Sequence, residues 1–322
     1  MKIEKFSPHS PLKTPILFLI FKRLDTTKQV FEQIRIAKPR KFYLAADGPR
    51  ENIEGEIDKC KVVREYVLNN TDWDCEIKTL FRDKNLGCGR AVSEAITWFF
   101  EHEEKGIIFE DDVVPSLSFF WFCEELLERY KSDMRIWRIG GCNFQDGNKR
   151  GDGDYYFSAI SHIWGWASWA NRWKFNDFEL KNINDDSFIE NYWEGPALKY
   201  WKKIFWNIKD KILNKEFYTW DYQWLFTMWY HQGLGISPNV NLISNIGFGR
   251  DATHTENIDL KVANLPKGNI ILKNHPKEVV RDIEADYYTF YRNFYIPIWR
   301  RFILKLRSIK IFSKLNKNKI RS

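Results

Sequence analysis

Short apolar runs alternate with helix-like segments through the first third of the chain, and no other feature restricts the fold as strongly. The apolar runs cover residues 16–21, 41–46, 75–81 and 106–110, and they are typical of buried strands. Strands joined by helices of this length must pair in parallel, because each crossover returns the chain to the same edge of the sheet. The pattern predicts an α/β fold with a mixed, mainly parallel sheet flanked by helices.

The segments between these runs predict three helices, each with one apolar face toward the sheet. The predicted faces consist of Val30, Ile34 and Ala37 in the first helix, Ile53, Ile57, Val62 and Val63 in the second, and Val92, Ala95, Ile96, Phe99 and Phe100 in the third. With helices and strands in this order, the carboxyl ends of all four strands lie on one edge of the sheet.

Composition limits the class of protein. A chain of 322 residues with 44% hydrophobic and 29% charged residues can bury the core of one large or two small domains. Its net charge of +7 suits an anionic partner, although much of the excess lies in the last part of the chain. The five cysteines form no CxxC pair, and the apolar run at 15–21 is too short for a signal peptide. We therefore expect reduced thiols and a cytoplasmic location.

Charged residues follow the predicted strands at the point where each strand ends. They are Lys22 and Arg23, then Asp47 with Gly48, then Arg82 with the loop NLGCGR, and finally Glu110, Asp111 and Asp112. Ligands bind at the carboxyl ends of the strands in open parallel sheets. Cations there suit phosphates, whereas carboxylates suit a divalent metal ion or sugar hydroxyls.

The acidic triplet of Glu110, Asp111 and Asp112 is the most informative of these groups. It directly follows an apolar strand and directly precedes Val113, so a ligand site is favoured over a solvated acidic turn. Other phosphate-binding motifs are absent from the sequence: the glycines at 87–89 do not complete GxGxxG, and GxxxxGK[ST] does not occur.

The segments PILFLIFKR, AADG and NLGCGRAVSEAITWFFEHEEKGIIFEDDVVPSLSFFWF together resemble the nucleotide-sugar-binding half of GT-A glycosyltransferases. The similarity is greatest to the N-acetylglucosaminyltransferase I type and its bacterial relatives, over residues 15–125, and it is looser at 247–255. It implies a Rossmann-like donor-binding half at 1–125 and an acceptor-binding and catalytic half at 126–286.

The resemblance also implies roles for individual residues. Asp112 would ligate Mn²⁺ or Mg²⁺, while Glu110 and Asp111 would face sugar and ribose hydroxyls. Asp47 would contact the base or ribose of the donor, for which a UDP-sugar is expected. Arg23 and Arg90 lie in segments that contact the donor in this family.

A glycine-rich segment, GFGRDATHT at 247–255, has the composition of a lid that closes over a diphosphate. Arg250 would then contact phosphate, and His254 would contact phosphate or act as an additional metal ligand. An ordinary polar loop is the alternative.

Glycosyl transfer also needs a base for the acceptor hydroxyl, and a carboxylate suits this task. The candidate is Asp221, between Trp220 and Trp224, because a Trp-Asp segment in this region supplies the base in the resembling enzymes. The alternative is a helix N-cap. Glu216 and Asp251 are the other carboxylates nearby.

The segment SHIWGWASWANRW at 161–173 is rich in tryptophan. Core packing is the favoured interpretation for most of its four tryptophans, while one or two would line a sugar site: Trp164, Trp166, Trp169 and Trp173. Gly165 would allow a ligand to approach the backbone. A structural, hydrogen-bonded role is favoured for His162.

The chain changes character at residue 287, where a basic tail without acidic residues begins and runs to 322. A helical stripe of Ile298, Phe302, Leu306 and Ile309 lies opposite the cations, as in a helix that binds an anionic membrane surface. The alternatives are a helix packed on the body and a nucleic-acid-binding arm; we favour the inner face of the cytoplasmic membrane and no nucleic acid.

Together these features predict a metal-dependent, inverting hexosyl- or N-acetylhexosaminyltransferase that acts in polysaccharide biosynthesis. It would move a sugar from a nucleotide-diphosphate donor to a saccharide acceptor, with lipid-linked and cell-surface glycans among the candidates. The inverting outcome follows from the resemblance and from the single base candidate. Two other classes remain open: a metal-dependent phosphohydrolase and a non-catalytic nucleotide-sugar-binding protein.

Overall fold

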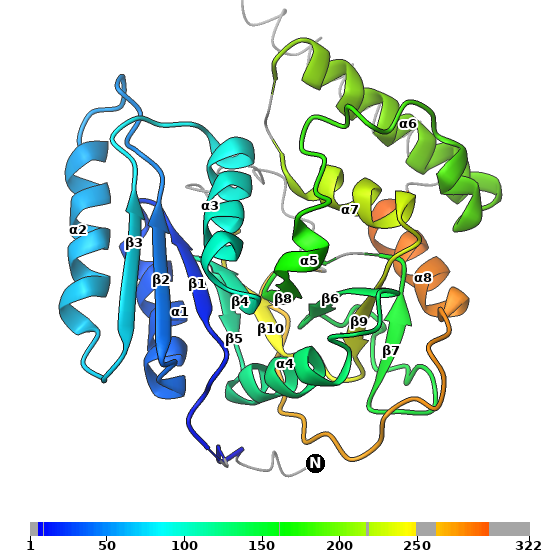
Figure 1. Cartoon of the computed structure of the whole chain (residues 1–322), viewed down its shortest axis with the longest axis horizontal. Coiled ribbons are helices and arrows are strands. Elements are labelled where there is room, and N and C mark those ends of the chain that lie inside the picture. Colours follow the sequence, from blue (N-terminus) through cyan, green and yellow to red (C-terminus); the bar gives the residue numbers. More distant parts are fainter. Residues whose placement is uncertain (1–5, 9, 161, 217–218, 249–261, 296–322) are drawn as a thin grey trace, which may run out of the picture.

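The computed structural model describes residues 6–8, 10–160, 162–216, 219–248 and 262–295, and Figure 1 shows its arrangement. An eight-stranded sheet has the order β3-β2-β1-β4-β8-β6-β9-β7, and β10 and β5 form a two-stranded sheet beside it. The strands are β1 Ile16–Ile20, β2 Lys41–Ala46, β3 Glu76–Phe81, β4 Lys105–Glu110, β5 Val113–Pro115, β6 Ile136–Gly140, β7 Tyr155–Ser158, β8 Trp166–Trp169, β9 Leu234–Pro238 and β10 Ile243–Asn245.

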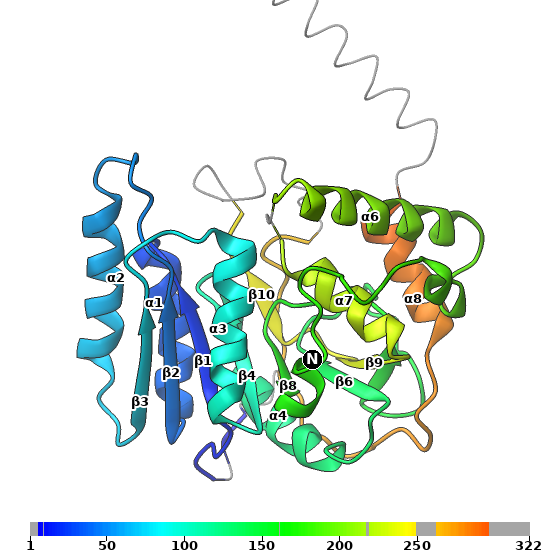
Figure 2. The same ribbon diagram turned by 45° about the horizontal axis from the view of Figure 1, so that its top comes forward.

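Helices cover both faces of the large sheet (Figures 1 and 2). They are α1 Leu24–Ala37, α2 Glu56–Asn70, α3 Cys88–His102, α4 Leu117–Arg129, α5 Ala170–Trp173, α6 Gly195–Leu213, α7 Asp221–Tyr230 and α8 Ile283–Thr289, with the shorter turns η1 Ser187–Asn191 and η2 Phe290–Phe294. Among the described residues, no helix has the length and apolarity needed to cross a membrane.

The strand directions confirm the predicted fold class. Strands β3, β2, β1 and β4 are parallel to one another, and β6 pairs in parallel with β9. Strand β8 is antiparallel to both β4 and β6, and β7 is antiparallel to β9. The sheet is therefore mixed and mainly parallel, with the carboxyl ends of β1 to β4 on a single edge.

Strand β1 shows why these strands are apolar along their whole length. Ile16, Phe18 and Ile20 pack on the face covered by α1, α2 and α4, whereas Leu17 and Leu19 pack on the face covered by α3, α6 and α7. Alternate side chains of a strand point to opposite faces, and here both faces are covered. Both sets are consequently buried.

The predicted faces of α1 and α3 are buried, but the predicted face of α2 is wrong in part. Ile57 and Val62 are 65% and 46% exposed, and Ile53 precedes the helix. Cys60, Val63 and Val67 form the buried stripe instead. Val62 and Val63 are neighbours in the sequence, so they cannot both face the sheet, and the spacing of the stripe selects Val63.

The described part of the predicted tail belongs to the packed body. Residues 287–294 complete α8 and form η2, and Phe290 is fully buried against the ring of Trp193. The buried Asp286 anchors α8, because it accepts hydrogen bonds from the Ser158 hydroxyl, the Ala159 N–H and Arg281. The stripe from Ile298 to Ile309 lies outside the described residues.

All five cysteines are free thiols.

Glu56, at the start of α2, carries a buried carboxylate between two cations. Its oxygens accept hydrogen bonds from Lys22 Nζ at 2.7 Å and from Arg50 Nη2 at 2.6 Å. Hydrogen bonds from Arg50 are the main reason that the pKa of Glu56 falls to about 2. Because this pKa lies below that of the unfolded chain, the contribution to stability is present above about pH 4.5 and is lost as the pH falls toward 2.

Glu56→Gln should therefore destabilise the protein at neutral pH by about 1–3 kcal/mol, because two hydrogen-bonded ion pairs lose their charge. The difference in free energy of unfolding between variant and wild type should shrink between pH 4.5 and pH 2. Urea unfolding at pH 7 and at pH 3 measures both. A difference that does not change with pH would contradict the assigned ionisation of Glu56.

Candidate active site at the carboxyl edge of the sheet

Arg23 joins the ends of two neighbouring strands. It is the N-cap residue of α1, just after β1, and Asp111 and Asp112 form the turn that follows β4. Since β1 and β4 pair in parallel, these ends meet, and Arg23 Nη2 lies 2.7 Å from Asp111 Oδ1 and 2.7 Å from Asp112 Oδ2. The structure thus brings together an arginine and the acidic triplet, as the sequence predicts for this edge.

The triplet holds more negative charge than Arg23 neutralises. Asp111 is 5% exposed, and its Oδ2 atom is buried without a hydrogen-bond partner among the described residues. Burial raises the pKa of both Glu110 and Asp111; Asp112 adds to the effect on each, and Arg23 opposes it. A bound cation, or hydroxyl groups that donate hydrogen bonds, would stabilise the ionised form of these carboxylates.

The start of the glycine-rich segment packs directly on Asp112. Strand β10 pairs with β5, and the N–H of Ile246 donates to the Asp112 carbonyl at 2.8 Å. A Cβ atom on Gly247 would lie 2.0 Å from Asp112 Oδ2. Gly247 therefore shapes the site, whereas Arg250 and His254, the predicted phosphate contacts, lie outside the described residues.

Gly247→Ala should displace the Asp112 carboxylate, because the added methyl group and the carboxylate oxygen cannot occupy the same space. We expect donor affinity to fall by about tenfold or more, with a smaller change in melting temperature. In an Asp112→Gly background the same substitution should have little further effect. Calorimetric titration of the four proteins completes the cycle, and additive losses would argue against this contact.

Asp221 lies close to the triplet from a separate part of the chain. It is the first residue of α7. Burial is the main cause of the raised pKa values of Glu110 and Cys88, and the charge of Asp221 adds to both. The N-cap residue is Trp220, whose side chain makes no capping hydrogen bond, so Asp221 is the first helical residue and does not occupy the N-cap position. The Thr219 hydroxyl donates a hydrogen bond to Asp221 Oδ1, and the start of a helix favours a negative charge.

Asp47 and Arg90 occupy different surroundings from the triplet. The Asp47 carboxylate accepts hydrogen bonds from the N–H groups of Gly48, Leu86 and Gly87, and so fixes the loop before α3. Arg90, in the first turn of α3, lies 3.8 Å from Glu94 and over the ring of Phe178. The structure shows a loop-organising role for Asp47; its contact with a base or ribose stays a prediction.

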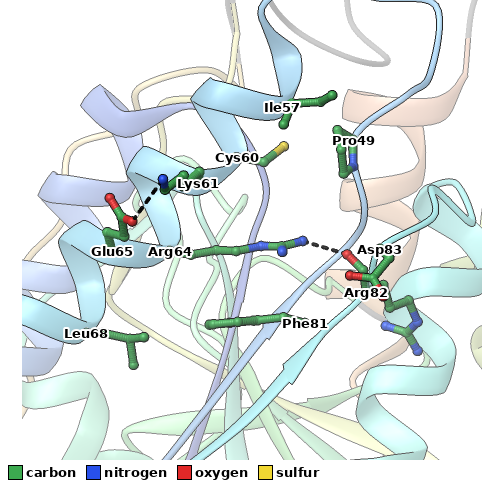
Figure 3. Close-up of a pocket in the computed structure, with 10 residues that line it drawn as sticks. All are labelled: Pro49, Ile57, Cys60, Lys61, Arg64, Glu65, Leu68, Phe81, Arg82 and Asp83. Atoms are coloured by element: carbon green, nitrogen blue, oxygen red, sulfur yellow. Dashed lines mark hydrogen bonds and ion pairs between the residues drawn. The ribbon is translucent and has the colours of Figure 1, made fainter.

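Sequence reasoning missed Arg64, which links the loops after β2 and β3. Its Nη2 atom donates to the carbonyls of Asp47 at 2.9 Å and Arg82 at 2.8 Å. Figure 3 shows Arg64 extending from α2 above Phe81. The hollow that these residues line has a volume of about 460 Å³. No local motif marks Arg64, because its partners are backbone atoms of distant loops.

The tryptophan-rich segment is mostly core. Trp166, Trp169 and Trp173 are at most 3% exposed, and Trp166 stacks on Trp220 at 5.7 Å. Trp164 is partly buried, beside Phe248 at the start of the glycine-rich segment, which keeps it as the sugar-facing candidate.

Two other residues of this segment, Gly165 and His162, lie against buried side chains. Gly165 has φ +64°, and a Cβ there would lie 2.6 Å from the Ile243 side chain, so a larger residue would clash with the core. A ligand contact at Gly165 stays a prediction. Burial lowers the pKa of His162 to about 3, and its ring packs on Phe144 at 4.5 Å. Its carbonyl accepts a hydrogen bond from Arg138.

The carboxylates of the triplet suit a divalent cation that is bound together with the phosphates of a substrate. Among the described residues, no three His, Cys, Asp or Glu side chains form a cluster that would hold a metal ion. Mg²⁺ is commonly bound by one or two carboxylates together with substrate phosphates and water. Asp112 at the rim, with the unpartnered oxygen of Asp111 behind it, suits that kind of binding.

Comparison with known proteins gives no family assignment. No family model and no curated protein matches the chain, so the resemblance to the N-acetylglucosaminyltransferase I type is not confirmed. Among solved structures, the mannosyltransferase PcManGT from Pyrobaculum calidifontis, in complex with GDP-Man and Mn²⁺, is 12% identical over 51% of this chain and 48% of its own, with a TM-score of 0.32.

Two further structures show a similar level of likeness. S. aureus TarS 1-349 is 8% identical over 70% of this chain and 58% of its own, with a TM-score of 0.37. The glycosyltransferase GlyE of Streptococcus pneumoniae is 13% identical over 64% of this chain and 43% of its own, with a TM-score of 0.30. Nucleotidyltransferases also occur among the similar structures. With such low TM-scores, function must be inferred from the residues of this chain.

Proposed function

We propose that this protein is a glycosyltransferase that moves a sugar from a nucleoside-diphosphate donor to a saccharide acceptor. One observation carries the proposal. The acidic triplet at the end of β4 is bridged by Arg23 and lies within electrostatic reach of Asp221. The site thus combines groups for a cation and phosphates with a separate carboxylate for proton transfer, which are the two requirements of glycosyl transfer.

In this proposal Asp112 holds Mn²⁺ or Mg²⁺ together with the donor diphosphate. The ion supplies neutralisation of the charge that develops on the leaving diphosphate. Arg23 keeps Asp111 and Asp112 in place before the donor binds, and Gly247 leaves room for the Asp112 carboxylate. Glu110 and Asp111 orient sugar and ribose hydroxyls. A UDP-sugar is the proposed donor.

Asp221 is the proposed base. Its carboxylate takes the proton of the acceptor hydroxyl as that oxygen attacks the anomeric carbon and the bond to the diphosphate breaks. A single base on the acceptor side implies direct displacement and therefore inversion. Trp164, partly exposed beside the glycine-rich segment, is the proposed surface for the acceptor sugar.

Donor turnover separates this function from its alternatives. With Mn²⁺ and a panel of nucleotide-sugars, we expect slow release of the nucleoside diphosphate by the protein alone and an increase of about tenfold or more when a saccharide acceptor is added. Equal rates with and without acceptor indicate a phosphohydrolase. Donor binding without any turnover indicates a binding protein. A thermal-shift panel identifies the nucleotide-sugar to use, because a ligand specific for the folded state raises apparent stability.

A further inference from the structure

One nitrogen atom of Arg23 occupies the point where two carboxylates of the candidate site converge. Strands β1 and β4 lie side by side in the sheet (Figure 1), and Arg23 Nη2 lies 2.7 Å from both Asp111 Oδ1 and Asp112 Oδ2. A divalent cation held by carboxylate oxygens takes the same kind of position, at the shorter distances of metal coordination. The guanidinium and a cation that binds these two oxygens therefore exclude one another.

The Asp112 carboxylate has no room to move away from Arg23 toward the glycine-rich segment. A Cβ atom on Gly247 would lie 2.0 Å from Asp112 Oδ2, so this oxygen already faces the backbone of Gly247. The Asp112 carbonyl is fixed as well, because it accepts a hydrogen bond from the Ile246 N–H at 2.8 Å. A cation that binds Asp112 Oδ2 must consequently replace Arg23.

The backbone of Arg23 is fixed, whereas its side chain borders the solvent. The Arg23 carbonyl accepts hydrogen bonds from the Thr27 N–H at 3.1 Å and from the Thr27 hydroxyl at 2.6 Å. The side chain is 19% exposed, and within the described part of the chain its guanidinium is held by Asp111 and Asp112. Side-chain rotation alone can therefore carry the guanidinium from these carboxylates to a ligand beside them.

Displacement of Arg23 is more favourable when a diphosphate arrives with the cation. A cation alone would leave a partly buried guanidinium without its anionic partners, which is costly. A diphosphate provides a new partner, because the planar guanidinium binds phosphate oxygens through two parallel hydrogen bonds. The cation and the nucleotide should consequently each strengthen the binding of the other.

We propose that Arg23 takes the place of the divalent cation in the free protein and moves to the donor diphosphate when the cation binds. Arg23 thereby makes tight binding of the cation depend on the nucleotide. This inference rests on the proposed function, since it concerns the cation and the diphosphate of the same site. Its measurable quantity is the coupling factor, which is the Kd of Mn²⁺ without nucleotide divided by the Kd with saturating nucleotide.

Mn²⁺ binding to wild-type protein, Arg23→Gln and Lys22→Gln tests the proposal, with electron paramagnetic resonance measuring free Mn²⁺ in the presence and absence of UDP or GDP. We expect a coupling factor of about 100 in the wild type and one at least about tenfold smaller in Arg23→Gln. Arg23→Gln should also bind Mn²⁺ alone about tenfold more tightly, because no guanidinium has to leave. Lys22→Gln is the matched control, since it removes a neighbouring charge that pairs with Glu56, and it should keep the wild-type coupling.

Tighter Mn²⁺ binding by the same factor with and without nucleotide would overturn the inference, because Arg23 would then act through its charge alone and stay on the carboxylates. An equal loss of coupling in Lys22→Gln would overturn it as well. Arg23→Lys is a second variant in case Arg23→Gln does not fold; it keeps the charge, cannot bind phosphate through two parallel hydrogen bonds, and should also show a smaller coupling factor than the wild type. Absence of Mn²⁺-dependent nucleotide binding in the wild type contradicts the proposed function itself, whereas unchanged coupling in the Arg23 variants contradicts this inference alone.

Discussion

Asp221→Asn should lower turnover by roughly 10²- to 10⁴-fold while donor affinity stays close to that of the wild type. Asparagine keeps the shape of the side chain and loses the basic carboxylate. The position suits this test, because Asp221 is close to Glu110 yet is not the residue that caps α7. Loss of the negative charge in the first helical turn should cost only about 0.3–1 kcal/mol of stability.

Single-turnover transfer to the acceptor measures this effect, and calorimetry with the donor checks that the site is intact. Glu216→Gln is the matched control, because Glu216 is an exposed carboxylate just before α7. Turnover within a factor of about two of the wild type in Asp221→Asn would remove Asp221 as the base. Equal losses in both variants would point to a general disturbance of the segment.

Much of the architecture follows from local sequence. The run at 41–46 coincides with β2, because a continuous apolar run marks a strand whose two faces are both covered. The predicted face of α3 is buried, because helical spacing brings its apolar side chains to one side. The meeting of Arg23 with Asp111 and Asp112 also follows, since parallel strands place their ends on one edge.

Other features depend on contacts between distant segments. Asp47 binds the backbone of residues 86 and 87, and Arg64 binds two loops, so neither role has a local signal. Gly165 faces Ile243 because β8 and β10 approach in space. The boundary predicted at residue 287 falls within α8, and Tyr287 packs on Trp193, a partner that the composition of the tail does not indicate.

Asp112→Asn should abolish the metal-dependent part of donor binding. Even residues that only support a metal ligand contribute about 10- to 100-fold to affinity, so loss of the ligand itself should cost at least about 100-fold. Arg23 retains its bond to Asp111 in this variant, and the fold should therefore survive. Asp58→Asn, on the exposed surface of α2, removes the same charge away from the site and should leave donor binding unchanged.

The central claim is that Asp112 and a divalent cation together hold a nucleoside diphosphate. Calorimetric titration of UDP and GDP into wild-type protein and Asp112→Asn, each with Mn²⁺ and with EDTA, tests it most directly. The account predicts that Mn²⁺ tightens binding of at least one nucleotide by about 100-fold in the wild type and has almost no effect in the variant. Binding that ignores Mn²⁺, or that responds to Mn²⁺ equally in both proteins, would contradict it.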